Sequence, residues 1–190
     1  MANLKNQADK TKGGSDSLEI AGPARIAPIL SFLSHLTEPE IVKVAIEQTV
    51  LTHHSIEAKE SVTFLTQASY RLMHGAGLED TLNQTAPVWA LNAAKSMLSQ
   101  KPVDAIAKLG QGCSISSALP SVLFLGIKHG DDTETAFIEN AMAGGDNCAR
   151  GLALGMILGT ANGQSSIPEH WINELNSAKS LYQLLEVASC

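Results

Sequence analysis

The run Ala143-Gly144-Gly145-Asp146-Asn147-Cys148-Ala149-Arg150-Gly151 leads into a segment of small residues with glycine at positions 151, 155, 159 and 163. Glycines 144 and 145 allow backbone angles that side chains disfavour, so Asp146 can stand at the N-terminus of the next helix. Unpaired amides and the helix dipole favour a carboxylate there. Two interpretations follow: Asp146 is a structural N-cap, or it is a carboxylate presented to a ligand.

The rest of the chain has helical periodicity. Apolar residues recur at spacings of three and four, and almost no segment alternates like a strand. We therefore predict an all-α fold of many short to medium helices packed at varied angles. Pro28 and Pro120 should each start or kink a helix. The expected helical segments are 23–33, 41–51, 62–75, 87–98, 103–109, 115–127, 132–142, 150–163 and 168–187.

Composition indicates a globular protein. With 190 residues, 44% hydrophobic and 17% charged, the chain is long enough for a single domain with its own core. We expect a flexible polar leader over residues 1–17 and a helical domain over 18–190. The net charge of −6 and the scattered basic residues argue against nucleic-acid binding.

The expected location is the cytoplasm. Cys113, Cys148 and Cys190 are widely spaced, which fits neither a zinc site nor a disulfide framework. The N-terminus lacks the apolar stretch of a signal peptide. The most apolar segment, Leu152–Ala161, has about half of the roughly 20 residues that a membrane span needs, so no membrane contact is expected.

Several segments resemble known motifs. Four segments resemble motifs of the ADP-ribosylglycohydrolases, and they occur in the same order. Residues 21–29 (AGPARIAPI) resemble Gly-x-Ala-Met-Arg-x-Ala-Pro-Leu, and residues 51–58 (LTHHSIEA) resemble Thr-His-x-x-Pro-Glu-Ala. Residues 143–163 resemble the Gly-Gly-Asp-Thr-Asp-Thr motif and the helix after it, and residues 167–171 (IPEHW) resemble Ile-Pro-x-x-Trp. This family also contains the J-type lens crystallins. The resemblance, from about Ser17 to Leu175, implies a single orthogonal helical bundle of that type, limited to its C-terminal two-thirds and lacking the family's N-terminal helices.

The resemblance also implies a metal site. In the family, Gly-Gly-Asp-Thr-Asp-Thr supplies oxygen ligands to two magnesium ions, and further ligands come from an N-terminal acidic motif that we expect to be missing here. Asp146 matches one ligand. Cys148 and Ala149 occupy the second carboxylate and hydroxyl positions, where magnesium needs oxygen.

Three residues match the family's substrate-binding positions: Ser17, Arg25 and His53. Ser17 matches a position in the family's loop that binds the diphosphate of ADP-ribose. In this chain Glu19 places a negative charge in that loop. Arg25 has two interpretations, a ligand for phosphate or carboxylate and a structural partner of a neighbouring acid. His53 lies beside the family's ligand cleft or interacts with a helix C-terminus. We assign no catalytic residue.

Two other acidic clusters read as helix caps. Asp132 follows a glycine that closes one helix and precedes the next apolar pattern. Thr37-x-x-Glu40 is a capping box with Pro39 in the first turn. We therefore expect neither cluster to bind metal.

The family's chemistry is the magnesium-assisted hydrolysis of ADP-ribosyl glycosidic bonds. We expect a catalytically impaired relative, with ADP-ribose or an ADP-ribosylated substrate as its ligand. The alternatives are a non-catalytic, crystallin-like or pseudo-enzyme scaffold and a truncated gene product. We also expect self-association through exposed apolar faces, above all the glycine-faced helix.

Overall fold

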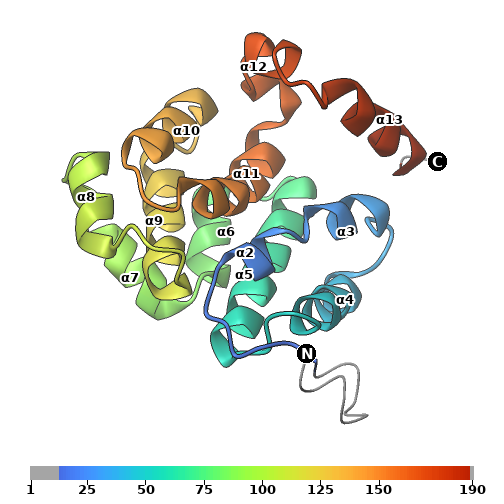
Figure 1. Ribbon diagram of the computed structural model, residues 1–190, viewed down its shortest axis with the longest axis horizontal. Helices are drawn as coiled ribbons and strands as arrows, with labels where there is room; N and C mark the ends of the chain where they lie inside the picture. The colour runs from blue at the N-terminus through green and yellow to red at the C-terminus, as the bar shows by residue number, and fades with distance from the viewer. Residues whose placement is uncertain (1–12, 189–190) are drawn as a thin grey trace.

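The computed structural model describes residues 13–188, and over this range the protein is all-α, as predicted. Two isolated bridges, Ser15 with His53 and Glu19 with Ser114, are its β-type pairings. The elements, shown in Figure 1, are α2 (Ala21–Ala24), α3 (Ala27–Phe32), α4 (Glu38–Val50), α5 (Ile56–Met73), α6 (Leu78–Thr85), α7 (Val88–Ser96), α8 (Pro102–Leu109), α9 (Ile115–Lys128), α10 (Thr133–Met142), α11 (Asn147–Asn162), the 3-10 turn η2 (Gln164–Ser166), α12 (Glu169–Asn173) and α13 (Ala178–Ala188).

Three helices form the centre of the molecule. In Figure 1 α5, α9 and α11 lie in the middle, with α7 and α8 on one side and α3 and α4 on the other. The run 118–126 of α9 is buried throughout, and Phe64, Leu65 and Leu154 are also buried. Burying each large apolar side chain contributes about 1.5–3 kcal/mol. The packing of α11 against α5 and α9 therefore fixes where the two ends of α11 lie.

Two expected helices are divided in the structure, and one helix was not expected. The expected helix 23–33 is divided into α2 and α3, because Pro28 has no amide to continue the first helix. Pro28 does start α3, and Pro120 lies inside α9. The expected helix 168–187 is divided into α12 and α13. Helix α6 was not expected, since its sequence LEDTLNQT has few apolar residues.

The N-terminal part of the described chain is held by hydrogen bonds. Residues 1–12 of the expected leader lie outside the described residues. Ser15 donates its amide to the Thr52 carbonyl at 3.0 Å and accepts from the His54 amide at 2.8 Å. Gly14 is buried, and a Cβ on it would lie 2.4 Å from the Val50 carbonyl oxygen. Residues 13–17 thus run along the loop between α4 and α5.

None of the described helices is both long enough and apolar enough to cross a membrane.

Candidate functional site

Asp146 follows a turn made by two glycines. Gly144 and Gly145 have φ angles of +69° and +67°, a left-handed conformation that glycine adopts without strain. A Cβ on Gly145 would lie 2.2 Å from the Gln111 carbonyl oxygen. The Asp146 amide donates to that same oxygen at 2.8 Å. The paired glycines therefore seat Asp146 against the loop that precedes α9.

The Asp146 carboxylate caps α11. One of its oxygens accepts a hydrogen bond from the Ala149 amide at 3.2 Å, which satisfies one of the free amides of the first turn. The capping interpretation is therefore confirmed. A role for Asp146 as a ligand to metal or substrate stays a prediction.

Arg150 supports the turn from inside. Its side chain is fully buried, and it donates to the Gly144 carbonyl at 2.9 Å. It also donates to the carbonyl and the side-chain oxygen of Asn140, at 2.9 and 2.6 Å. Burial lowers the pKa of Arg150, and the negative charge of Asp146 opposes this shift. Our sequence reasoning missed this role, although Arg150 is the single charged residue of α11.

A second strand-like segment brings Glu19 next to Cys113. The Ile20 amide donates to the Cys113 carbonyl at 3.0 Å, and the Ile115 amide donates to the Leu18 carbonyl at 2.7 Å. The Cys113 thiol donates to a Glu19 carboxylate oxygen at 3.5 Å. The pKa of Cys113 is raised, first by burial of the thiol, then by the hydrogen bond and charge of Glu19, with a smaller effect of Asp146. Glu19 therefore contacts the thiol, and Asp146 is held by Gln111, two residues before Cys113.

Arg25, Thr52 and His53 form a hydrogen-bonded chain. The Arg25 guanidinium donates to the Thr52 hydroxyl, and the Thr52 oxygen lies 2.9 Å from Nδ1 of His53. The Thr52 hydroxyl, which accepts from Arg25, has two acceptors for its own proton: Nδ1 of His53 and, at 3.4 Å, the Thr49 carbonyl. The pKa of His53 is lowered by burial and by Arg25, and Glu19 opposes the shift. Arg25 thus has a hydroxyl as its partner, rather than an acid.

Gly22 and Ser17 connect these residues to α2. A Cβ on Gly22 would lie 2.4 Å from the His53 ring, so the start of α2 packs directly on the imidazole. The Ser17 hydroxyl accepts from the Glu19 amide at 3.3 Å, and the Ser17 carbonyl accepts from the Ser55 hydroxyl at 3.0 Å. The Ser17 hydroxyl is therefore engaged within its own turn.

The structure brings the four predicted site residues to one region around α2. Ser17, Arg25 and His53 are joined through segment 15–25 and the loop 52–55. Asp146 stands at the start of α11, which packs against α2, and its amide is bound by Gln111, two residues before Cys113. Sequence reasoning did not identify Thr52 or Cys113 as members of this region, because Arg25, which binds Thr52, and Glu19, which binds Cys113, are 27 and 94 residues away in the chain.

The donor set does not fit magnesium. Cys148 offers an exposed thiol instead of an oxygen ligand, and the Ala149 side chain has no atom that could bind a metal. One carboxylate oxygen of Asp146 already accepts the capping hydrogen bond. Among residues 13–188, no group of three or more His, Cys, Asp or Glu side chains is arranged to hold a metal ion. Magnesium in proteins needs several oxygen ligands in octahedral array.

The two other acidic clusters are caps, as predicted. The Asp132 carboxylate accepts from the Thr135 amide at 2.9 Å, and this hydrogen bond lowers the pKa of Asp132. Glu40 accepts from the Thr37 amide at 2.9 Å within the predicted capping box. The Glu38 carboxylate forms a salt bridge with the Arg71 guanidinium, with 3.1 Å between Oε1 and Nη2.

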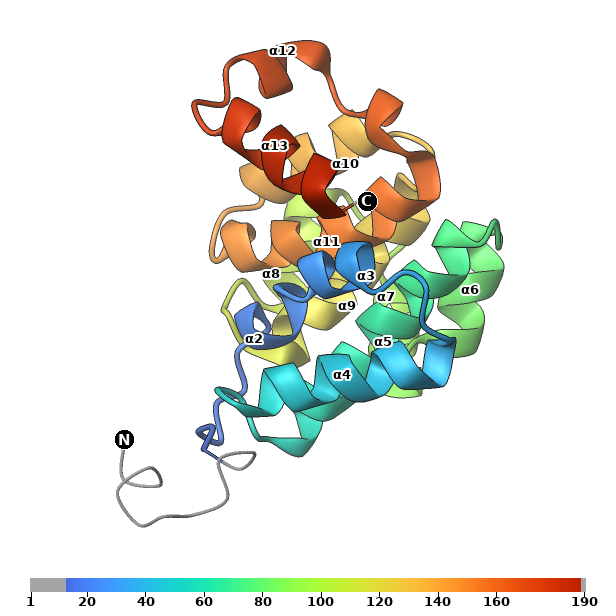
Figure 2. The ribbon, with the colours of Figure 1, turned by 90° about the vertical axis from the view of Figure 1, so that its right-hand side faces the viewer.

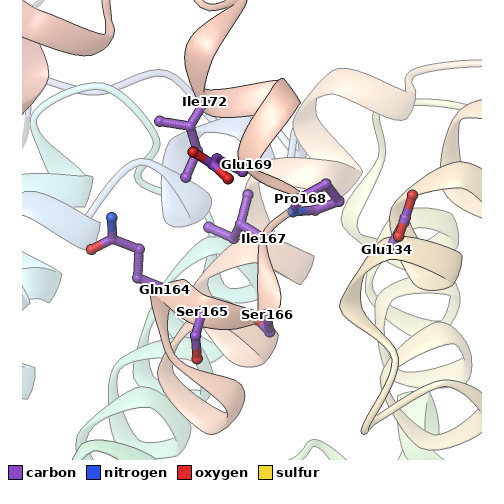
Figure 3. Close-up of a pocket in the computed structure, with 8 residues that line it drawn as sticks. All are labelled: Glu134, Gln164, Ser165, Ser166, Ile167, Pro168, Glu169 and Ile172. Atoms are coloured by element: carbon purple, nitrogen blue, oxygen red, sulfur yellow. The ribbon is translucent and has the colours of Figure 1, made fainter.

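An open groove of about 670 Å³ lies away from this region, beside η2 and α12. Figure 3 shows its two acidic residues, Glu134 and Glu169, on opposite sides of Pro168. Its lining residues are Glu134, Gln164, Ser165, Ser166, Ile167, Pro168, Glu169 and Ile172.

Comparison with protein families matches residues 1–189 to the family described as ADP-ribosylglycohydrolase. This match confirms the family resemblance, and it covers more of the chain than the segment from about Ser17 to Leu175 that contains the motifs. No curated protein matches the chain.

Proposed function

The chain belongs to the ADP-ribosylglycohydrolase family, and we propose on that premise that it is a catalytically impaired member. In this proposal it retains a surface for ADP-ribose but does not carry out magnesium-assisted hydrolysis with its own residues. The observation that carries the proposal is the state of the Asp146 turn. The carboxylate caps a helix, and the two positions that should follow it with oxygen donors are Cys148 and Ala149.

The remaining polar groups favour weak binding that is independent of metal. Arg25 is an exposed cation beside His53, whose lowered pKa favours the neutral imidazole with one ring N–H as a donor. Glu19 and Asp146 oppose the approach of a diphosphate, because both carboxylates carry negative charge in the same region. We therefore expect the ligand to make its main contacts with Arg25 and His53.

A scaffold that binds no nucleotide is the second candidate, and Glu19 is the observation that favours it. Its carboxylate lies beside Cys113, within the segment that resembles the family's diphosphate loop. For either candidate, the wide spacing of the cysteines supports a reducing, cytoplasmic location.

The test is isothermal titration of the full chain with ADP-ribose, with and without magnesium. Asp146→Asn keeps the N-cap and removes the charge, whereas Asp146→Ala removes both. We expect weak binding that magnesium does not change, that Asp146→Asn retains or strengthens, and that Arg25→Ala removes.

A hydrolysis assay on an ADP-ribosylated protein completes the test, and we expect no release of ADP-ribose. Magnesium-dependent release that Asp146→Asn abolishes would overturn the proposed impairment. Absence of heat under all conditions would favour the scaffold.

A further inference from the structure

The end of α11 carries the single Asn-Gly pair of the sequence, Asn162-Gly163. Asparagine is a thermolabile residue type, and a glycine after it leaves the next backbone nitrogen unhindered, because glycine has no Cβ. Gly163 has a φ angle of +74°, outside the helical range. Figure 2 shows the chain turning away from the end of α11 toward α12. The pair therefore forms the joint between α11 and η2.

A chain of hydrogen bonds holds the Asn162 side chain. Its Nδ2 donates to the Gly130 carbonyl at 2.7 Å and to the Thr133 hydroxyl at 3.0 Å. The Thr133 hydroxyl donates to the Ser166 hydroxyl at 3.0 Å, which in turn donates to the Gly163 carbonyl at 2.7 Å. The chain thus leads from the side chain of Asn162 back to the residue that follows it.

The backbone of the pair is held as well. The Gly163 amide donates to the Gly159 carbonyl at 3.1 Å, and the Gly163 carbonyl also accepts from the Ser166 amide at 3.2 Å. For the Gly163 nitrogen to reach Cγ of Asn162, the Cα–Cβ and Cα–C bonds of Asn162 must rotate away from the helical arrangement. These rotations break the hydrogen bonds of both Nδ2 and the Gly163 amide. The folded joint therefore keeps the two reacting atoms apart.

We propose that Asn162 is a site of self-modification by deamidation, which reacts when the end of α11 opens. The Gly163 nitrogen loses its proton and bonds to Cγ of Asn162, the Cγ–Nδ2 bond breaks, and Nδ2 leaves as ammonia. Water then opens the resulting succinimide ring at one of its two carbonyl carbons, which gives aspartate or isoaspartate. Water is the single co-reactant.

The product carries a negative charge where the fold has placed an amide donor. The new carboxylate at position 162 faces the Gly130 carbonyl, and two acceptors do not bind each other. Asn162 also lines a cavity of about 420 Å³ between α6, α9 and α11, together with Glu79 and Asp131. A third carboxylate there adds like-charge repulsion. Deamidation therefore weakens the joint that had prevented it. This inference does not depend on the proposed function.

The experiment incubates the full chain at neutral pH and body temperature, in buffer and in concentrated urea. Trypsin then releases residues 151–179, and fragment mass spectrometry locates each exchange of an amide for a carboxyl group. Asn173 and Asn176 lie in the same peptide and serve as internal standards, because neither precedes glycine.

Two buried-threonine variants test the hydrogen-bonded chain. Thr133→Val removes the hydroxyl that binds Nδ2 and Ser166. Thr66→Val is the matched control, since Thr66 is also buried and its hydroxyl bonds to the Val62 carbonyl within α5. The control measures the general effect of losing a buried hydroxyl away from the joint.

We expect Asn162 to be modified before Asn173 and Asn176 in urea, and at least about tenfold more slowly in buffer. Thr133→Val should raise the rate in buffer about threefold or more, leave the rate in urea unchanged, and exceed any effect of Thr66→Val. Equal rates in buffer and urea overturn the proposal. So does a rate in buffer that Thr133→Val changes no more than Thr66→Val does.

Asn162→Asp tests the consequence of the modification. Loss of the buried donor should lower the midpoint of thermal unfolding by roughly 3–10 °C. Asn176→Asp adds the same charge at an exposed position and should leave the midpoint nearly unchanged. Equal midpoints for the two variants would overturn the claim that the modified joint is weakened.

Discussion

The two ends of α11 use glycine in opposite ways. Before the first turn, Gly145 brings its backbone against the Gln111 carbonyl, and buried Arg150 ties the turn together. Further along the helix, Gly159 faces open space. At position 145 glycine allows close backbone packing within the chain, and at position 159 it leaves a space that no atom of the chain fills. The residue type alone does not distinguish the two, and only the surrounding atoms do.

Removing the support of the turn should have the largest effect. Arg150→Ala leaves three oxygens on Asn140 and Gly144 without their buried donor, so we expect a loss of about 3 kcal/mol in the free energy of unfolding. In thermal denaturation this corresponds to roughly 6–12 °C. Arg150→Lys, which keeps the charge and some of the hydrogen bonds, should lose less. A loss below about 1 kcal/mol for Arg150→Ala would contradict this account.

Gly145→Ala and Gly144→Ala separate close approach from backbone strain. Both positions have similar positive φ angles, so alanine costs about 1–2 kcal/mol of strain at each. A Cβ at 145 also meets the Gln111 backbone at 2.2 Å, whereas the nearest atom at 144 is the end of the Gln111 side chain at 3.7 Å. Urea denaturation should therefore show a larger loss for Gly145→Ala. Equal losses would mean that the contact with Gln111 contributes nothing.

Gly159→Ala should change stability with the opposite sign. Its new methyl group meets no atom within 4 Å, and alanine is the better helix former. We expect a gain of about 0.5–1 kcal/mol in the same urea experiment, measured at low protein concentration so that association does not contribute. A destabilised monomer would show that this position is already packed.

The smallest effect concerns His53 and pH. Its pKa is lowered in the folded chain by burial and by Arg25, so the unfolded chain binds the proton more readily. The stability that His53 contributes is present above the unfolded pKa of about 6.5 and is lost as the pH falls through the lower folded pKa. The unfolding free energy should therefore fall from about pH 7.5 to 5, less steeply in His53→Gln. Equal slopes would argue against a neutral His53.

Local signals in the sequence were reliable. The capping box at Thr37, the caps at Asp132 and Asp146 and the helix start at Pro28 all depend on residues within a few positions of each other. Such interactions are set by local backbone geometry, so a pattern of neighbouring residues predicts them. Helix α6 was missed because its stability comes from packing on α5 rather than from its own apolar pattern.

The candidate site was predictable in part. Ser17, Arg25, His53 and Asp146 were chosen through family resemblance, and the fold brings their segments together through hydrogen bonds and the packing of α11 on α2. Thr52 and Cys113 act through neighbours that only the tertiary structure supplies. Arg150 left one sequence signal, a lone charge in a helix of small and apolar residues, but its acceptors are backbone carbonyls that no sequence pattern reveals.

The pairing of segment 18–20 with 113–115 affects how the protein emerges from the ribosome. Glu19 and Cys113 are 94 residues apart. Translation adds about 5–20 residues per second, so roughly 5 to 20 s pass between the synthesis of these two partners. During that interval Ile20 has no Cys113 carbonyl to bind. The surroundings of Asp146 and Glu19 are therefore assembled late in translation, after the α4–α5 pair has had time to form.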